Sequence, residues 1–215
     1  MHSTEDEAAG GAVDDPLLLD AALRALAAWG WEGMTLDRIA SEAGRSRVTL
    51  WRQGVRRDGI SAGLLLRLAA SHRQALWPVV TSTGTPRARL EDALAALCRV
   101  ADDNLVLLSG CDTAFHDAET AGLVPRGEFS RPLERILRDG VADGTLRPGS
   151  SPEETASVLF NAVCWTHVHL RARHRWSPER ARRSVLGLVL HGVVADQAPV
   201  VPKSRSPKSP RPGTM

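Results

Sequence analysis

A helix-capping residue stands directly before a proline, with an apolar pattern after it, at Asp15-Pro16, Ser151-Pro152 and Ser177-Pro178. A capping oxygen accepts a free backbone N–H of a helix's first turn, and proline has no N–H to lose there, so each pair predicts a helix start. After each pair, leucine, valine and alanine recur every three or four residues, as on one helix face. We find no convincing strand pattern. The sequence therefore predicts an all-α protein with about nine helices.

Composition agrees with that prediction and disfavours other classes. Of 215 residues, 43% are hydrophobic but only 4% are aromatic, which argues against an aromatic-rich β-sandwich or barrel. Three widely spaced cysteines without a CxxC pair argue against a disulfide framework or a zinc ribbon. The acidic N-terminus is unlike a signal peptide, and no apolar run approaches the ~20 residues of a membrane span. We expect a cytoplasmic protein with no membrane partner.

Charge and proline content divide the chain into four predicted parts. These are a disordered acidic tail (1–14), a three-helix, helix-turn-helix domain (15–60), a C-terminal helical bundle (61–197) and a disordered, proline-rich basic tail (198–215). A long helix from about 58 to 77, ended by Pro78, is expected to join the first domain to the bundle. Residues 111–126 contain glycine and proline and are expected to be irregular.

Residues 35–52 predict the helix-turn-helix itself. Thr35 can cap a first short helix, Gly44-Arg45 can form a tight turn, and Ser46 can cap a second short helix. The capped helix starts also leave N–H groups that favour phosphate.

The second short helix has the chemistry of a DNA-recognition helix. Its spacing directs Arg47, Thr49 and Arg52 outward and Leu50 inward. A helix fits the major groove of B-DNA, where arginine pairs bidentately with guanine. Five arginines and no acidic residue between 45 and 57 add charge for the phosphates. We therefore expect double-stranded DNA as a partner.

A skeleton of residues around this motif makes the prediction more specific. It consists of Asp20-Ala21-Ala22-Leu23, Gly30, Thr35, Ile39-Ala40, Ala43-Gly44, Ser46, Thr49-Leu50 and Trp51. This skeleton resembles the DNA-binding domain of the tetracycline-repressor (TetR) family of transcriptional regulators. Residues 141–148 resemble the turn before that family's two dimerisation helices. The resemblance implies a homodimeric regulator, in most cases a repressor, that an unknown small-molecule effector releases from its operator.

The motif and the resemblance together assign DNA contact to nine residues. They are Thr35, Arg45, Ser46, Arg47, Val48, Thr49, Trp51, Arg52 and Arg57. Within this set we expect Arg47 to contact a base and Val48 to contact a thymine methyl group. Trp51 stands where the family usually has tyrosine and is expected to pack on the sugar-phosphate backbone. Arg57 is expected to contact phosphate, as a basic residue does at that position of the family.

The bundle is expected to bind the effector and to dimerise. Four candidate ligand-binding residues combine apolar area with polar groups: Phe115, His116, Asn161 and Trp165. Four candidate dimer-interface residues lie on the last helix: Leu186, Val189, Leu190 and Val193. That helix is apolar around nearly its whole circumference, so it needs cover on two sides.

Two groups of side chains leave other functions open. Cys164, His167 and His174 share a helix face, and Asp112 and His116 have the spacing of an acid-base pair. A small helical metal-binding protein or enzyme is therefore one alternative, and a DNA-binding dimer without an effector is another. We predict a non-enzyme with no metal and no cofactor, since neither group has the further residues that its chemistry needs.

Overall fold

The computed structural model describes residues 11–192, which form helices joined by short connections. In chain order the helices are α1 (Pro16–Gly33), α2 (Leu36–Glu42), α3 (Arg47–Arg52), α4 (Arg57–Val80), α5 (Pro86–Asp103), α6 (Leu105–Gly110), α7 (Ala114–Thr120), α8 (Arg131–Ala142), α9 (Pro152–Ala172) and α10 (Pro178–His191). No strand occurs between residues 11 and 192, so the all-α prediction is confirmed. This part of the chain has ten helices rather than about nine.

The predicted capping residues stand at the observed helix starts. Asp15, Ser151 and Ser177 each accept backbone N–H groups from the first turn of α1, α9 and α10. Thr85 does the same for α5. Because these donors have no partner inside the helix, the caps fix where each helix begins.

The additional helix is α7, which lies in the segment predicted to be irregular. Its buried side consists of Ala114, Phe115 and Ala118. On the other side Thr113 Oγ1 donates a hydrogen bond to Asp117 Oδ2 at 2.8 Å, across one helical turn. The glycine and proline that predicted irregular structure come after α7 and do not interrupt it.

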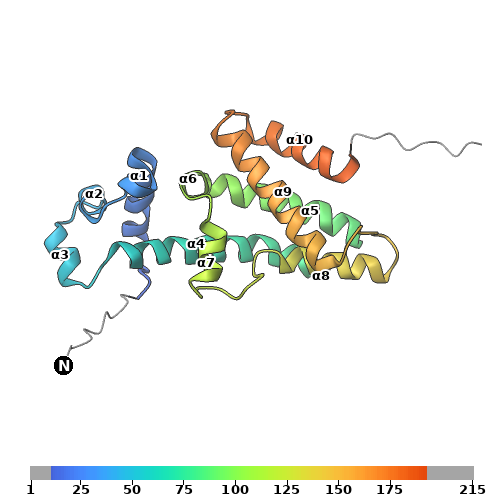
Figure 1. The fold of residues 1–215 in the computed structure, drawn as a ribbon, viewed down its shortest axis with the longest axis horizontal. Coiled ribbons are helices and arrows are strands. Elements are labelled where there is room, and N and C mark those ends of the chain that lie inside the picture. The colour runs from blue at the N-terminus through green and yellow to red at the C-terminus, as the bar shows by residue number, and fades with distance from the viewer. Residues whose placement is uncertain (1–10, 193–215) are drawn as a thin grey trace, which may run out of the picture.

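The long helix α4 connects the two parts of the molecule. Its first turns lie among α1, α2 and α3, and the rest runs along the bundle that contains α5, α8 and α9 (Figure 1). We call α1 to α3 with the first turns of α4 the head. The sequence predicted that Pro78 ends this helix at residue 77. Pro78 instead lies inside the last turn of α4, which continues to Val80. A proline this close to a helix end removes one hydrogen bond and leaves the earlier turns intact.

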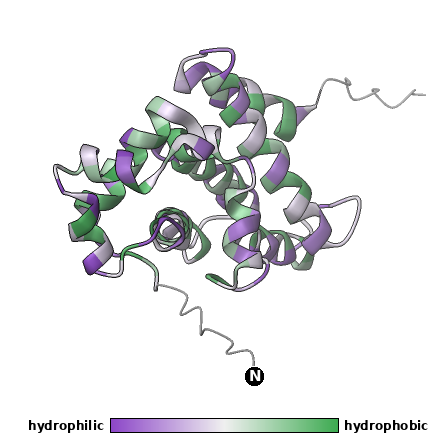
Figure 2. Cartoon of the chain, turned by 60° about the vertical axis from the view of Figure 1, so that its left-hand side comes forward, coloured by the Kyte–Doolittle hydropathy of each residue, from purple (hydrophilic) through white to green (hydrophobic). Residues whose placement is uncertain are grey.

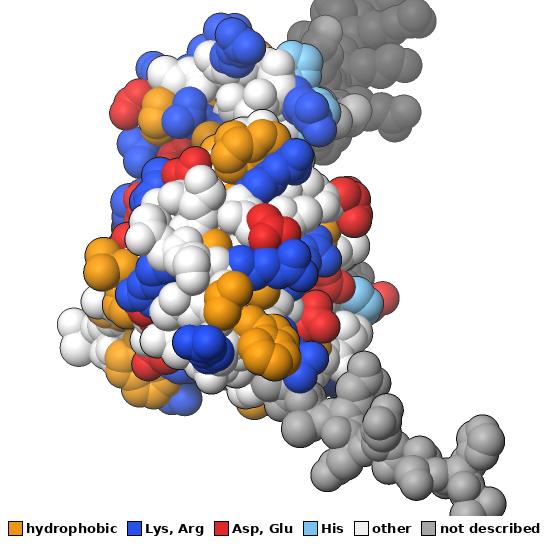
Figure 3. Space-filling model, turned by 90° about the vertical axis from the view of Figure 1, so that its left-hand side faces the viewer, with side chains coloured by type: hydrophobic (Ala, Val, Ile, Leu, Met, Phe, Trp, Pro, Cys, Tyr) orange, Lys and Arg blue, Asp and Glu red, His pale blue; other side chains and the backbone are white. Residues whose placement is uncertain are grey.

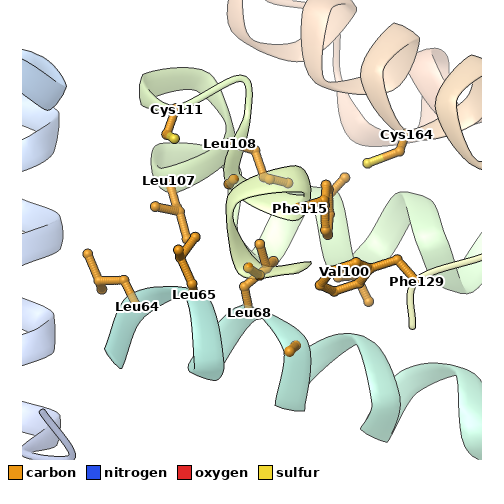
Figure 4. Close-up of a cluster of buried hydrophobic side chains, with 14 of the residues drawn as sticks. Leu64, Leu65, Leu68, Val100, Leu107, Leu108, Cys111, Phe115, Phe129 and Cys164 are labelled. Atoms are coloured by element: carbon orange, nitrogen blue, oxygen red, sulfur yellow. The ribbon is translucent and has the colours of Figure 1, made fainter. Parts of the chain in front are cut away.

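A continuous apolar core packs against one face of α4. Figure 4 shows Leu65 and Leu68 of α4 pointing toward Leu107 of α6 and Phe115 of α7, and all four are buried. Hydrophobic residues gather on the sides of the helices that face one another, and hydrophilic residues lie outside (Figure 2). Burial of this surface is what holds short helices such as α6 and α7 in place, since helices of that length are unstable alone.

The segment before α1 packs on the start of α4. The backbone N–H of Val13 donates to the carbonyl of Gly59 at 2.8 Å. Gly63 lies so close that an added Cβ would be 2.2 Å from the carbonyl oxygen of Val13. The sequence predicted a disordered tail over residues 1–14, but Val13 is ordered by its hydrogen bond to α4. Residues 1–10 and the predicted tail of 198–215 lie outside the described residues.

Candidate nucleic-acid interface and ligand hollow

α2 and α3 form the predicted helix-turn-helix at the outer end of the head. Thr35 Oγ1 accepts the N–H of Arg38 at 3.4 Å, and Ser46 Oγ accepts the N–H of Thr49 at 3.0 Å. Both predicted caps are thereby confirmed. Leu50 is fully buried and anchors α3 on the head.

The remaining sides of α3 face solvent. Val48 is 56% exposed and Trp51 is 71% exposed, and Arg47 and Arg52 are exposed beside them. Figure 3 views this end of the molecule, where arginine side chains lie among hydrophobic ones. A cationic surface with exposed apolar groups has the chemistry to contact phosphates, guanine edges and thymine methyl groups together.

Arg47 has a partner within the head. Its Nη1 lies 3.0 Å from Oδ2 of Asp37, in the first turn of α2. Both side chains stay more than 60% exposed, at 64% and 61%. The pair therefore lies at the solvent boundary, where a bound ligand could reach it.

Arg45 holds the head together. Its Nη1 donates to Oδ2 of Asp15 at 2.7 Å, which ties the turn before α3 to the start of α1. Only about a third of each side chain is exposed, at 32% and 34%. The Arg45 guanidinium keeps the pKa of Asp15 below its ordinary value. The structure thus places this predicted DNA contact in an internal ion pair.

Arg57 also points inward. Its Nε donates to the carbonyl of Met34 at 3.1 Å, and its Nη2 donates to the carbonyl of Trp31 at 2.8 Å. Arg56, at the N-cap of α4, is exposed, and its side chain makes no capping hydrogen bond. The sequence predicted a phosphate contact for Arg57 and none for Arg56, because spacing alone does not show which of two adjacent arginines faces outward.

The four candidate ligand-binding residues line one hollow of about 1210 Å³ in the bundle. Phe115 and His116 come from α7, and Asn161 and Trp165 come from α9. The α8 side of the hollow contributes three exposed arginines, Arg131, Arg135 and Arg138. Asp112 also lines the hollow, but no hydrogen bond joins it to His116 among the described residues. The acid-base pair of the alternative enzyme hypothesis is therefore not formed, and both residues line the hollow instead.

The hollow is connected to α4 by two adjacent residues. The ring of His72 contacts that of Phe129, which lines the hollow, with 5.2 Å between centroids. Arg73 Nη2 lies 3.1 Å from Oε1 of Glu128. His72 is 2% exposed, and burial lowers its pKa to about 4. Movement of the loop that contains Glu128 and Phe129 would therefore act on the helix that begins in the head.

A buried polar cluster joins α5 to α9. Nε2 of His167 lies 3.1 Å from Oδ2 of Asp102 without hydrogen-bond alignment, and Arg171 pairs with the same carboxylate. Burial lowers the pKa of His167 and raises the pKa of the Cys164 thiol. His174, by contrast, is exposed beyond the end of α9. Within residues 11–192 no three His, Cys, Asp or Glu side chains lie together as a possible metal site.

The last helix packs most of its apolar residues on its own chain. The described members of the predicted dimer interface are half-buried against the core: Leu186, Val189 and Leu190. Val193 lies outside the described residues. Leu188, on the same helix, is 56% exposed, and Val158 of the adjacent α9 is 62% exposed. No helix in the described part of the chain is long and apolar enough to span a bilayer.

The head, the linking helix and the bundle together define the two-part helical fold of TetR-type regulators. PfmR, a TetR family regulator from Thermus thermophilus, shares 19% identity with a TM-score of 0.68, over 84% of this chain and 100% of its own. The MbdR regulator from Azoarcus sp. CIB shares 18% identity with a TM-score of 0.66, over 83% and 98%. FadR from Bacillus subtilis, in complex with stearoyl-CoA, shares 16% identity with a TM-score of 0.61, over 83% and 98%.

These similarities confirm, at the level of the fold, the resemblance that the head residues suggested. No protein-family model matches the sequence, and no curated protein matches it either.

Proposed function

We propose that this chain is a TetR-type transcriptional regulator that binds a double-stranded DNA operator as a homodimer and leaves it when a small molecule occupies the hollow. The observation that supports DNA binding best is the surface of α3. Leu50 is fully buried while Val48 and Trp51 are more than half exposed, at 56% and 71%, beside exposed arginines. Exposed apolar side chains that lie together on one surface are typical of a site that contacts a partner.

Release by an effector has a physical route in the contacts of α4. A ligand in the hollow shifts DNA affinity only if it prefers one of two arrangements of the protein. The contacts of His72 and Arg73 with the hollow's loop link that preference to the helix that begins in the head. FadR is in complex with stearoyl-CoA, so stearoyl-CoA is the first compound to test for release.

Selection of bound DNA from a random pool tests the central proposal. We expect enriched sequences with two symmetric half-sites, because a two-fold dimer presents two recognition helices. Arg47→Ala should lose ~1–3 kcal/mol of binding free energy and relax the preference at one position per half-site. Failure of the wild-type protein to enrich any sequence at low salt would refute DNA recognition by α3.

A further inference from the structure

One exposed ion pair joins the two helices of the helix-turn-helix on the surface proposed to bind DNA. Asp37 lies in the first turn of α2, and Arg47 is the first residue of α3, with 3.0 Å between Oδ2 and Nη1. Ion pairs between exposed side chains contribute little to stability. With both side chains more than 60% exposed, at 61% and 64%, folding gives little reason for this pair.

We propose that Asp37 is a specificity-determining residue that acts through Arg47. It holds the guanidinium in position for a base, and it penalises binding to DNA that lacks the matching base. The inference rests on the proposed function, because it requires α3 to lie in the major groove.

The geometry of the pair leaves the rest of the guanidinium available. A guanidinium has five N–H donors in one plane, and Asp37 contacts it only through Nη1. The edge formed by Nε and Nη2 has no hydrogen-bond partner among the described residues. Two parallel N–H groups on such an edge match the O6 and N7 acceptors of guanine. Asp37 therefore orients Arg47 without occupying the edge that would contact the base.

Holding Arg47 in one position favours the matching site. The Arg47 side chain loses rotamer freedom when it binds a base. Because the pair with Asp37 already restricts Arg47 in the free protein, less of this entropy is lost on binding DNA. The gain applies only where the base offers the two acceptors that fit the held orientation.

The same carboxylate opposes binding at other sites. On DNA without the matching base, Arg47 gains most by turning to a phosphate, which would leave the Asp37 carboxylate unpaired beside a polyanion. On the matching site Arg47 contacts both Asp37 and the base. Discrimination thus comes from a repulsive element as well as an attractive one.

The test compares Asp37→Asn with a matched control, Asp20→Asn. Asp20 pairs with Arg67 of α4 at 2.5 Å. This pair is also exposed, with 47% of the Asp20 side chain and 49% of the Arg67 side chain accessible. Both substitutions remove one negative charge and one exposed ion pair from the N-terminal part of the chain. Affinity is measured at several salt concentrations for the selected operator and for a random-sequence duplex of equal length.

Asp37→Asn should lower the ratio of operator to random-duplex affinity by about tenfold, mainly by strengthening binding to the random duplex. Asp20→Asn should raise both affinities by the same small factor. Asp37→Glu should restore most of the ratio. In an Arg47→Ala background, Asp37→Asn should no longer change the ratio, because Asp37 acts through that arginine.

An unchanged ratio for Asp37→Asn, or an equal change for Asp20→Asn, would overturn this inference while leaving operator binding intact. A wild-type protein that selects no preferred DNA sequence would instead overturn the proposed function. That selection experiment is separate from the comparison of variants and precedes it. Asp37→Asn and Asp20→Asn should change stability by no more than about 1 kcal/mol, since an exposed ion pair and an acid in a helix's first turn each contribute little.

Discussion

Two adjacent arginines at the start of α4 have opposite surroundings, and we expect opposite effects from removing them. Arg57→Ala should destabilise the fold by about 1–2 kcal/mol, because two backbone carbonyls lose their donor. Arg56→Ala should leave stability unchanged but weaken binding to all DNA sequences and reduce the salt dependence of binding. Urea unfolding and salt-dependent DNA affinity separate the two effects. A flatter salt dependence for Arg57→Ala at unchanged stability would restore the phosphate contact to Arg57.

His72 should make the stability of the bundle sensitive to mild acid. Burial, together with the nearby Arg73 charge, lowers its pKa to about 4 against an ordinary value of 6.5. Between those values the unfolded chain binds a proton that the folded chain does not, so stability falls as pH drops from 6.5 toward 4. The loss from this group is at most roughly 3 kcal/mol, and it disappears above pH 6.5.

His72→Leu should flatten this part of the stability profile, as measured by urea unfolding at a series of pH values. His174→Gln, at an exposed histidine, is the control and should leave the profile unchanged. An equally steep profile in His72→Leu would assign the acid sensitivity to other groups.

Spacing predicted side-chain direction well but did not predict side-chain partners. The helical period correctly placed Leu50 inside and Arg47, Thr49 and Arg52 outside. It could not show that Arg45 pairs with Asp15 across 30 positions of sequence, because that contact depends on how the helices pack. The partner of a long flexible side chain depends on which other helices the folded backbone brings within its reach.

At the scale of helices, α4 depends on one small residue. Gly63→Ala would place a Cβ 2.2 Å from the carbonyl oxygen of Val13, so the segment before α1 must move. We expect a loss of about 1–3 kcal/mol, since the close contact is with backbone and not with a flexible side chain. Gly187→Ala on α10 is the matched control: a Cβ there meets nothing within 4 Å, and alanine favours helix by up to ~1 kcal/mol. Thermal unfolding should therefore shift in opposite directions, and a stable Gly63→Ala would contradict the tight packing.

Helix starts were easier to predict than helix ends or short helices. A cap such as Ser151 is a local signal, and it correctly located the start of α9. The helix α7 was not predicted because no side chain caps its start, and burial of Ala114, Phe115 and Ala118 against the core stabilises it. Pro78 does not end α4 at residue 77, because it lies in the last turn, where few helical hydrogen bonds remain to be lost.

At the scale of the molecule, the exposed faces of α9 and α10 predict where a second copy binds. Leu188→Glu should give monomers with full helicity, because Leu188 is 56% exposed and its loss should not disturb the core. Those monomers should bind a two-half-site operator much more weakly, since each head then acts alone. Sedimentation and operator titration provide the readouts.

Val189→Arg is a poorer probe, because Val189 packs against the core and its replacement should also lower stability. A variant with Leu188→Glu that still sediments as a dimer would place the interface elsewhere. Arg183 is also exposed on α10. Arg183→Glu therefore tests whether a negative charge anywhere on this helix is enough to give monomers.

The bond between Val13 and Gly59 has a consequence for synthesis on the ribosome. Val13 emerges first, but its partner on α4 follows only after α1, α2 and α3, and the space beside Gly63 exists only once that turn has formed. The hydrogen bond of Val13 can therefore form once the first turns of α4 emerge, but α1 is fully covered only when α6, which also packs on it, has followed. The bundle must wait much longer, because α5 packs on α9, which is translated far later. A nascent chain stalled between α6 and α9 would display a packed head on an unfinished bundle. Force measurements with arrest sequences placed along α4 to α9 should therefore register two separate folding events.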